Sequence, residues 1–331
     1  MCARERRRSG TEAKPARAPR AAPRAVKSAS AGSRRRRGSE DVVVRRVARS
    51  ADDGFMSELA PGLRSRADAQ LLADELAFAA ARLSELEHSP PGLLGEAARL
   101  AGAGRREEGL WLLAQITVIG PREEGGDPFA AIAQAAVPWT AEDLPVVAAD
   151  ERGPRGSSDP ATTLRAYRAW AARSEGQAAG LAGDAAWSPA RRFERAFERL
   201  ALPGFARAAR YDFLLAAGAL GVADVRPASL QLMADPRGAT VAAAKRVFAF
   251  GDPIVLERRA AELAGASALP PGALDLGLSN WALRTDQPDA PRVTLGSQAA
   301  PDPVVRDVVL ATLGADEPAE DADDGDEPSP D

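Results

Sequence analysis

The sequence predicts an all-α protein with unstructured ends. Alanine, leucine, arginine and glutamate dominate, while aromatic residues make up only 5% of the chain, a balance that favours helices over sheets. Apolar residues recur three and four positions apart, and no stretch shows convincing strand alternation or a β-hairpin dipeptide. With 331 residues, 45% of them hydrophobic, the chain can build a sizeable core in one or two domains.

Charge is distributed unevenly along the chain. Residues 1–50 hold sixteen Lys and Arg against four Asp and Glu, whereas residues 315–331 hold nine acids and no base. Both ends are poor in large apolar groups, so we expect disorder there. The predicted organisation is a basic arm at 1–55, a helical lobe at 56–150, a second lobe at 151–314 and an acidic tail at 315–331, with the polar surface loop 150–158 between the lobes.

The basic arm has more than one interpretation. Its arginine clusters, interrupted by prolines, predict an electrostatic contact with nucleic acid, because each neutralised phosphate releases counterions. The alternatives are a non-functional extension upstream of a start at Met56, and an Arg-rich, acid-poor targeting peptide.

The scarcity of two residue types excludes several kinds of chemistry. Cys2 is the single cysteine and His88 the single histidine, so the chain alone cannot form a disulfide, a Cys/His zinc site, an iron–sulfur cluster or a histidine-activated nucleophile. We predict neither a metal nor a cofactor. The longest apolar run, 110–120, is too short to cross a bilayer, and no secretion signal is visible. We therefore expect a soluble, cytoplasmic protein without a membrane partner.

Capping signals predict where helices begin. Ser65 resembles an N-cap, and His88 is expected as a C-terminal cap or a solvated residue. A capping side chain followed by proline precedes five further helical patterns, at Asp127-Pro128, Asp159-Pro160, Ser188-Pro189, Asp252-Pro253 and Asp302-Pro303. We interpret these aspartates as caps before acids or bases. Together with helical periodicity, these signals predict helices over 65–87, 93–101, 106–119, 161–180, 189–201, 207–221, 240–250, 253–264, 271–284 and 304–313. The stretch 229–233 is unassigned.

The stretch from Phe193 to Gly221 organises the second lobe. It reads as a helix, a short break and a second helix, with apolar residues at helical spacing on both sides of the break. Pro203 cannot continue a helix, and Gly204 permits the backbone angles of a tight turn. The prediction is two amphipathic helices joined by a very short connection.

Three motifs in this lobe resemble one superfamily. Leu202-Pro-Gly-Phe-Ala-Arg207 resembles the hairpin of the helix-hairpin-helix DNA glycosylases, whose pattern is Leu-Pro-Gly-hydrophobic-Gly before a helix. Ala244-Lys-Arg-Val247 resembles the helix after their catalytic aspartate, and Leu274-Asp-Leu-Gly277 a late helix start. Together with Trp170, the runs RRFERAFERLALPGFARAARYDFLL and LDLGLSNWAL are most similar to the alpha-glutamyl/putrescinyl thymine pyrophosphorylase-like proteins, over most of residues 57–284.

The resemblance implies a DNA partner. Backbone amides around Gly204, Phe205 and Ala206, backed by the positive end of the next helix, would hold phosphate oxygens without sequence preference. Arg207 and Arg210 would add positive charge on one side of that helix. The alternative is a plain connector between helices, with solvated arginines.

Departures from the family pattern bear on catalysis. Ala206 replaces the second hairpin glycine, Val241 stands where base-excising relatives have the catalytic aspartate, and Ala208 where bifunctional relatives have a Schiff-base lysine. A glycosylase needs a carboxylate near the sugar, so these positions do not support ordinary base excision.

The pyrophosphorylase-like resemblance implies a different reaction, in which an amine-bearing group replaces the diphosphate of a diphosphorylated hydroxymethyl base in DNA. This chemistry needs cations for the leaving diphosphate and a carboxylate for the amine proton. The candidates are Lys245 and Arg246 as cations and Asp235 or Asp212 as carboxylate, with Trp281 to stack an extruded base. Each candidate has a structural alternative. Lys245 and Arg246 could be surface charges, and Asp235 could belong to a turn or an N-cap. Asp212 could be an intrahelical partner of nearby arginines, and Trp281 a core side chain.

Three functions remain open from the sequence. The first is a DNA base-modifying enzyme, which the ordered motifs favour. The second is a non-catalytic helix-hairpin-helix DNA-binding protein, which Val241 and Ala208 favour. The third is a helical interaction scaffold.

Overall fold

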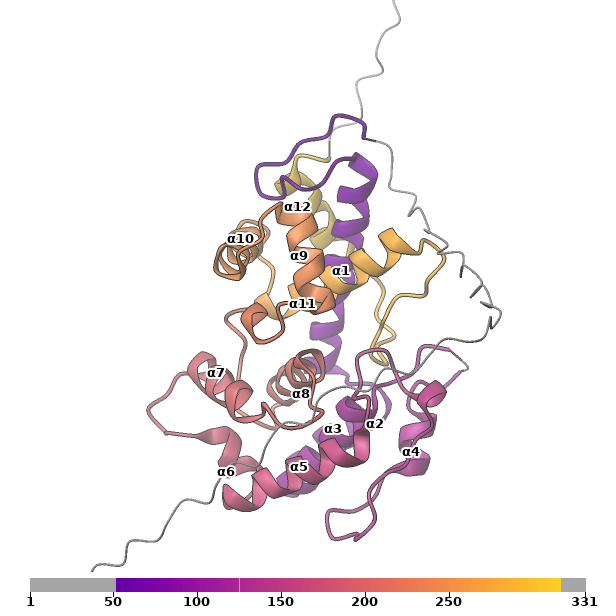
Figure 1. Cartoon of the computed structure of the whole chain (residues 1–331), viewed down its shortest axis with the longest axis vertical. Coiled ribbons are helices and arrows are strands. Elements are labelled where there is room, and N and C mark those ends of the chain that lie inside the picture. Colours follow the sequence, from indigo (N-terminus) through magenta and orange to yellow (C-terminus); the bar gives the residue numbers. More distant parts are fainter. Residues whose placement is uncertain (1–51, 125, 317–331) are drawn as a thin grey trace, which may run out of the picture. The chain divides into compact units, whose positions relative to one another are not determined.

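The computed structural model describes residues 52–124 and 126–316 (Figure 1). These residues belong to one compact unit of the chain. Their regular structure is helical, without a strand in the described ranges, so the predicted all-α fold is confirmed. The predicted basic arm and acidic tail lie almost entirely outside the described residues, and their disorder stays a prediction.

The α-helices of the described residues are joined by connections that differ widely in length. In chain order they are α1 (Arg66–His88), α2 (Gly92–Gly102), α3 (Arg106–Ile119), α4 (Ala130–Ala135), α5 (Pro160–Arg173), α6 (Gln177–Ala182), α7 (Pro189–Arg199), α8 (Arg207–Ala219), α9 (Ala239–Phe248), α10 (Pro253–Ala266), α11 (Pro271–Asp286) and α12 (Pro303–Leu313). Single 3-10 turns lie at η1 (Ala149–Glu151) and η2 (Leu232–Ala234), and the second overlaps the end of the unassigned stretch 229–233.

Most predicted helix starts are confirmed by their caps. The Ser65 hydroxyl accepts a hydrogen bond of 3.1 Å from the first turn of α1. Four of the five proline-marked caps also accept a bond from the following helix, at Asp159, Ser188, Asp252 and Asp302. The prediction at Asp127 is wrong, because its carboxylate accepts a bond of 2.9 Å from the amide of Phe129 in a turn, and α4 begins only at Ala130.

The predicted helix over 161–180 is also corrected, since it is two helices. Glu175 and Gly176 have φ angles of 60° and 123°, which end α5. The Glu107 carboxylate of α3 then accepts bonds of 2.9 and 2.8 Å from the amides of Gln177 and Ala178. A carboxylate seventy residues away therefore caps α6, and no local pattern announces it.

Helices from both predicted lobes pack together in the core. α1 packs against α11 and α12, and α3 packs against α2, α5 and α8 (Figure 1). Aromatic rings fill the space between α5, α8 and the connection before α8: the Tyr167 ring lies 5.6 Å from Phe213 and 6.5 Å from Phe205, both edge to face. The division into lobes at residue 150 stays a prediction.

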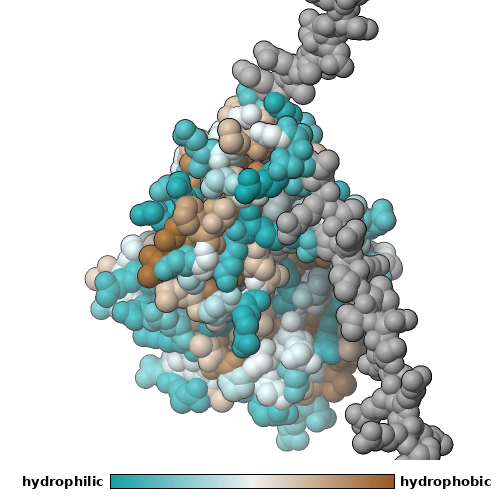
Figure 2. Space-filling view, turned by 45° about the horizontal axis from the view of Figure 1, so that its top comes forward, coloured by the Kyte–Doolittle hydropathy of each residue, from teal (hydrophilic) through white to brown (hydrophobic). Residues whose placement is uncertain are grey.

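Among the described residues, a few large apolar side chains stay exposed at the surface. Those that remain exposed are Met56, Val146, Met233, Phe250, Ile254, Val304 and Val308. Figure 2 shows one face, on which small hydrophobic patches lie between hydrophilic residues. Across 52–124 and 126–316, no helix combines the length and the apolar character needed to cross a bilayer.

Candidate functional site

The connection between α7 and α8 covers residues 200–206, so it is two residues longer than the predicted break at 202–206, and it contains a turn at Gly204. The predicted apolar face of α7 is buried, with Phe193, Ala196 and Phe197 each at most 2% exposed. The turn closes through hydrogen bonds of 3.0 Å from the Phe205 amide to the Leu202 carbonyl and from the Ala206 amide to the Gly204 carbonyl. Gly204 and Ala206 are exposed, while Phe205 is anchored in the core.

Gly204 is fixed in place by the start of α5. Its φ is 76°, in the left-handed region that favours glycine, and a Cβ atom there would clash with the Thr163 hydroxyl. The Ser157 hydroxyl donates to the Gly204 carbonyl at 2.9 Å and lies 2.7 Å from the Thr163 hydroxyl. The turn therefore has one backbone shape, held by two side chains.

Replacing Gly204 by alanine should lower the free energy of unfolding by about 2–3 kcal/mol, from the left-handed backbone angle and the displaced Thr163 hydroxyl. Gly221→Ala is the matched control, because φ there is 67° and no atom lies within 4 Å of the added Cβ. Gly221→Ala should lower the free energy of unfolding only through the left-handed backbone angle, by about 1–2 kcal/mol. Urea unfolding measures both variants, and equal losses would show that the contact with Thr163 is unimportant.

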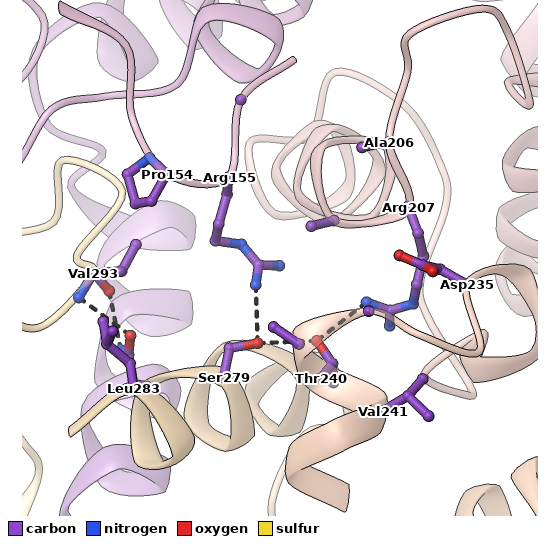
Figure 3. Close-up of a pocket in the computed structure, with 15 residues that line it drawn as sticks. Pro154, Arg155, Ala206, Arg207, Asp235, Thr240, Val241, Ser279, Leu283 and Val293 are labelled. Atoms are coloured by element: carbon purple, nitrogen blue, oxygen red, sulfur yellow. Dashed lines mark hydrogen bonds between the residues drawn. The ribbon is translucent and has the colours of Figure 1, made fainter. Parts of the chain in front are cut away.

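A cavity of about 270 Å³ opens beside this turn (Figure 3). Ala206, Arg207 and Ala208 at the start of α8 form one wall. The other walls are the start of α9 at 238–241, the loop at 154–156 and the α11 side chains of Ser279, Asn280 and Leu283. The cavity lining is mostly apolar, so the few polar groups on it decide what it can bind.

Two helix amide ends face this cavity. Neither the N-cap residue of α8, Ala206, nor that of α9, Gly238, provides a side-chain hydrogen bond to its helix. Within the described ranges no acceptor meets the amides of 207–209 or 239–241. Because unpaired amides and the helix dipole give both ends partial positive charge, the cavity walls favour an anionic group.

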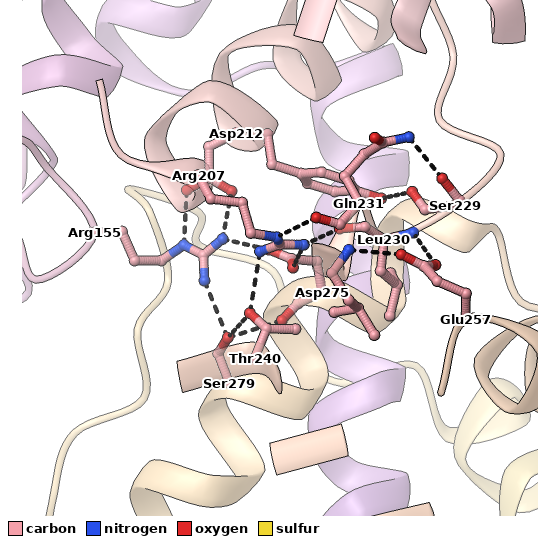
Figure 4. A network of polar contacts seen from close by, with 12 residues as sticks. Arg155, Arg207, Asp212, Ser229, Leu230, Gln231, Thr240, Glu257, Asp275 and Ser279 are labelled. Carbon is pink, nitrogen blue, oxygen red and sulfur yellow. Dashed lines mark hydrogen bonds and ion pairs between the residues drawn. The ribbon is translucent and has the colours of Figure 1, made fainter. Parts of the chain in front are cut away.

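A buried network of charges lies next to the cavity (Figure 4). The Arg155 guanidinium donates to both Asp212 oxygens, at 2.7 and 3.0 Å, and to an Asp275 oxygen at 2.5 Å. Arg207 donates to the other Asp275 oxygen at 2.6 Å and also to the Leu230 carbonyl. Hydroxyls of Ser279 and Thr240 complete it, with Arg155 donating to Ser279 at 3.1 Å and Arg207 to Thr240 at 3.3 Å.

The network pairs two arginines with two aspartates, so its formal charges balance. Its two arginines and two aspartates are each less than 10% exposed. Burial would raise the pKa of Asp275, but Arg207 and Arg155 outweigh it and hold that pKa below its usual value. Burial would likewise lower the pKa of Arg155, and Asp212 and Asp275 outweigh it and raise that pKa. These charges join the loop, α8 and α11, and they leave little net charge for a ligand.

Arg207 and Arg210, which were expected to add positive charge on one side of α8, are both buried. Arg207 is 4% and Arg210 7% exposed, because α8 is buried around most of its circumference. Arg207 is used in the network described above. Arg210 donates to the Phe197 carbonyl at 3.0 Å and packs on the Phe197 ring, and burial lowers its pKa. Both arginines hold the interior together.

The four predicted catalytic residues do not converge. Asp235 lines the cavity, and its carboxylate receives no hydrogen bond from the described residues. Asp212 is bound by Arg155 in the network. Lys245 and Arg246 lie in the last turn of α9, whereas the cavity meets its first turn, and Arg246 pairs with Asp286 at 2.8 Å. The two candidate cations therefore lie at the other end of α9 from the cavity that Asp235 lines.

Trp281 is a core side chain, which was the structural alternative to stacking an extruded base. It is 2% exposed and its indole Nε1 donates to the Asp68 carbonyl at 3.0 Å. Arg246 covers its ring at 4.8 Å, so no base can stack there without rearrangement. Val241 and Ala208 line the cavity. These are the two positions at which, by the resemblance described above, the hairpin glycosylases have the catalytic aspartate and the Schiff-base lysine.

Sequence reasoning missed Arg155 and Asp275. Asp275 had a usable signal, because a single acid in the apolar run of 272–278 must find a partner when the helix is buried. Arg155 had none, since charged residues in a loop rich in glycine and proline are ordinarily solvated.

Comparisons with known proteins give no relative for this site. No protein-family model matches the chain, and neither a curated protein nor a solved structure matches it. Among residues 52–124 and 126–316, no group of three or more His, Cys, Asp or Glu side chains is placed to hold a metal ion.

Proposed function

We propose that the chain binds DNA at the start of α8 and modifies a thymine-derived base held in the adjoining cavity. One observation carries most of the support: the uncapped first turns of α8 and α9 open on the same cavity, directly beside the exposed turn at Gly204. Backbone amides of this kind bind phosphate without reading sequence, which is how a protein positions a DNA strand before it acts on a base.

The DNA backbone would approach over the rim of the cavity. Ala206 is exposed, so a phosphate can reach the amides that follow it. Arg237, two residues after Asp235, is exposed, and its side chain forms no hydrogen bond or ion pair within the described residues, so it supplies a cation near the start of α9. The buried Arg207 and Arg210 would act only by holding the turn and α8 in position.

The cavity suits the base itself. Pro154, Val241, Leu283 and Val293 present apolar surface, and Asp235 offers a carboxylate on the same lining. An extruded base would lie against these apolar groups. The Asn280 side chain is already bonded to the Val293 backbone at 3.0 and 3.2 Å, so it shapes the wall and is not free for the base.

The proposed reaction assigns the groups on the cavity as follows. The amine nitrogen attacks the methylene carbon of the base, the carbon–oxygen bond breaks, and diphosphate leaves with the bonding electrons. Asp235 accepts the proton that the amine loses. The amide ends of α8 and α9 stabilise the departing diphosphate, a role that the distant Lys245 and Arg246 cannot fill from the last turn of α9.

A second candidate is a DNA-binding protein without catalysis. Its support is that Val241 and Ala208 occupy the cavity at the positions where relatives of the hairpin family have reacting groups. The same amide ends would then hold the backbone alone.

Both candidates are tested with the full chain on DNA that carries diphosphorylated 5-hydroxymethyluracil, with and without an added amine. For the enzyme we expect salt-dependent binding and an aminated nucleoside in mass spectrometry of the digested product. Asp235→Asn should abolish the product and retain binding, because the proposal places the DNA phosphate on backbone amides and gives Asp235 only the amine proton. Binding without any changed nucleoside supports the second candidate, and absence of salt-dependent binding contradicts both.

A further inference from the structure

A second cavity, of about 340 Å³, lies at the opposite end of α8. Three arginines line it, Arg106, Arg192 and Arg226, with Asp224 as the acid among its lining residues. We propose that this cavity is a binding site for a phosphate group. The site does not depend on the proposed function, because α8 is 13 residues and about 20 Å long and separates it from the first cavity.

Arg106 is held at the cavity by its neighbour. It is the first residue of α3, and Glu107 next to it binds the first amides of α6 at 2.9 and 2.8 Å. Ala178 and Ala182 of α6 line the cavity as well. The capping contact therefore fixes the start of α3 against α6 and brings the Arg106 side chain to the cavity.

Arg192 and Arg226 are brought together by the loop after α8. The Arg226 amide donates to the Pro189 carbonyl at 3.1 Å, which ties the loop to the start of α7. Arg192 of α7 pairs with Asp224 and donates to the Ala185 carbonyl at 3.0 Å. The fold thus brings three arginines that are far apart in sequence to one cavity.

The loop can lie this close only because Gly218 has no side chain. A Cβ atom at Gly218 would clash with the Val225 carbonyl. The carbonyls at this end of α8 are satisfied, since Ala217 accepts bonds of 2.9 Å from the amides of Val222 and Ala223. The partial negative charge of the helix end is therefore largely met by the loop and offsets the arginines little.

The cavity carries uncompensated positive charge. Arg106 and Arg226 are exposed, and their side chains form no ion pair or hydrogen bond within the described ranges. Arg192 is 15% exposed and its Nε is buried without an acceptor, whereas its partner Asp224 is 65% exposed and screened by water. Two free guanidinium groups and one half-satisfied one thus surround a space that an anion can enter.

A phosphate group matches this arrangement better than a carboxylate. Each guanidinium presents a planar fork of donors, and forks from three separate segments approach from different directions. A tetrahedral phosphate offers oxygens in several directions, whereas the two oxygens of a carboxylate meet one fork at a time. The phosphate can come from a free ion or nucleotide, or from a nucleic-acid backbone.

Titration calorimetry of the full chain at low salt tests the site with two probes, inorganic phosphate and a short oligonucleotide without terminal phosphates. Arg106→Ala/Arg226→Ala should weaken binding of at least one probe by tenfold or more. The matched control is Arg64→Ala/Arg173→Ala, which removes two exposed arginines away from both cavities and should leave affinity within about twofold.

The two probes separate the sources of the phosphate. A loss confined to the oligonucleotide identifies a backbone phosphate, and a loss for inorganic phosphate identifies a free one. Both outcomes support the site, because both depend on the arginine pair. Affinities for both probes that are the same in the two double variants would overturn it. Since all four replaced arginines are exposed, equal melting temperatures without phosphate will verify that the variants are folded.

Discussion

Asparagine in place of Asp275 is expected to lower the free energy of unfolding by about 3–5 kcal/mol. Asp275 is 1% exposed and is the shared partner of Arg155 and Arg207, at 2.5 and 2.6 Å. The replacement leaves Arg207 without an acid and Arg155 with Asp212 alone. A buried cation without its counter-charge is costly, so urea unfolding of the full chain at pH 7 should reveal the loss directly.

Asp286→Asn is the matched control for this prediction. It removes the same charge from the same helix, α11, but its partner Arg246 is 2.8 Å away at the surface, and the Asp286 side chain is 47% exposed. An exposed pair contributes little, so we expect a loss below about 1 kcal/mol. Losses of equal size in the two variants would contradict the special role of the buried network.

The same network predicts how stability depends on pH. The pKa of Asp275 is lower in the folded chain than its usual value, because Arg207 and Arg155 outweigh the effect of burial. Its contribution is therefore complete above the unfolded pKa of about 4 and is lost as the pH falls through the lower folded pKa. The difference between the wild type and Asp275→Asn should shrink below about pH 4, and a difference that is constant down to pH 3 would contradict this account.

Local signals were sufficient for most of the fold. Ser65 and Asp159 begin helices through their own side chains, and Pro203 with Gly204 makes the turn before α8, so a short window of sequence contains the cause. The break before α6 is different, because its cap is Glu107 of α3. A long-range hydrogen bond leaves no pattern in the residues around Gly176.

The site was less predictable for the same reason. Arg155 and Asp275 are 120 residues apart, so their pairing depends on how the loop meets α11. Lys245 follows Asp235 by only ten residues, yet the rise of α9 carries it to the far end of the helix from the cavity. Distance along the chain was therefore a poor guide to which charges share a site, whereas Pro203 and Gly204 alone were enough to predict the turn.

Aspartate in place of Ala206 is expected to weaken DNA binding by about tenfold, without loss of stability. Ala206 is exposed and has φ −57° and ψ 154°, angles that an N-cap residue adopts. An aspartate there would accept a hydrogen bond from the first turn of α8 and place a negative charge where the proposal puts a phosphate. The variant should unfold at the same urea concentration as the wild type or a higher one, because a new cap adds about 1 kcal/mol.

Ala206→Asn separates the charge from the cap. Asparagine has nearly the same shape and also caps a helix, but it does not repel phosphate, so the affinity should fall less than with aspartate. Affinities measured between 50 and 200 mM salt add a second readout, since the loss of one phosphate contact reduces the slope of log K against log salt by about 0.9. If the aspartate variant binds DNA like the wild type while gaining stability, then capping the start of α8 does not affect DNA binding. The phosphate must then lie elsewhere on the molecule.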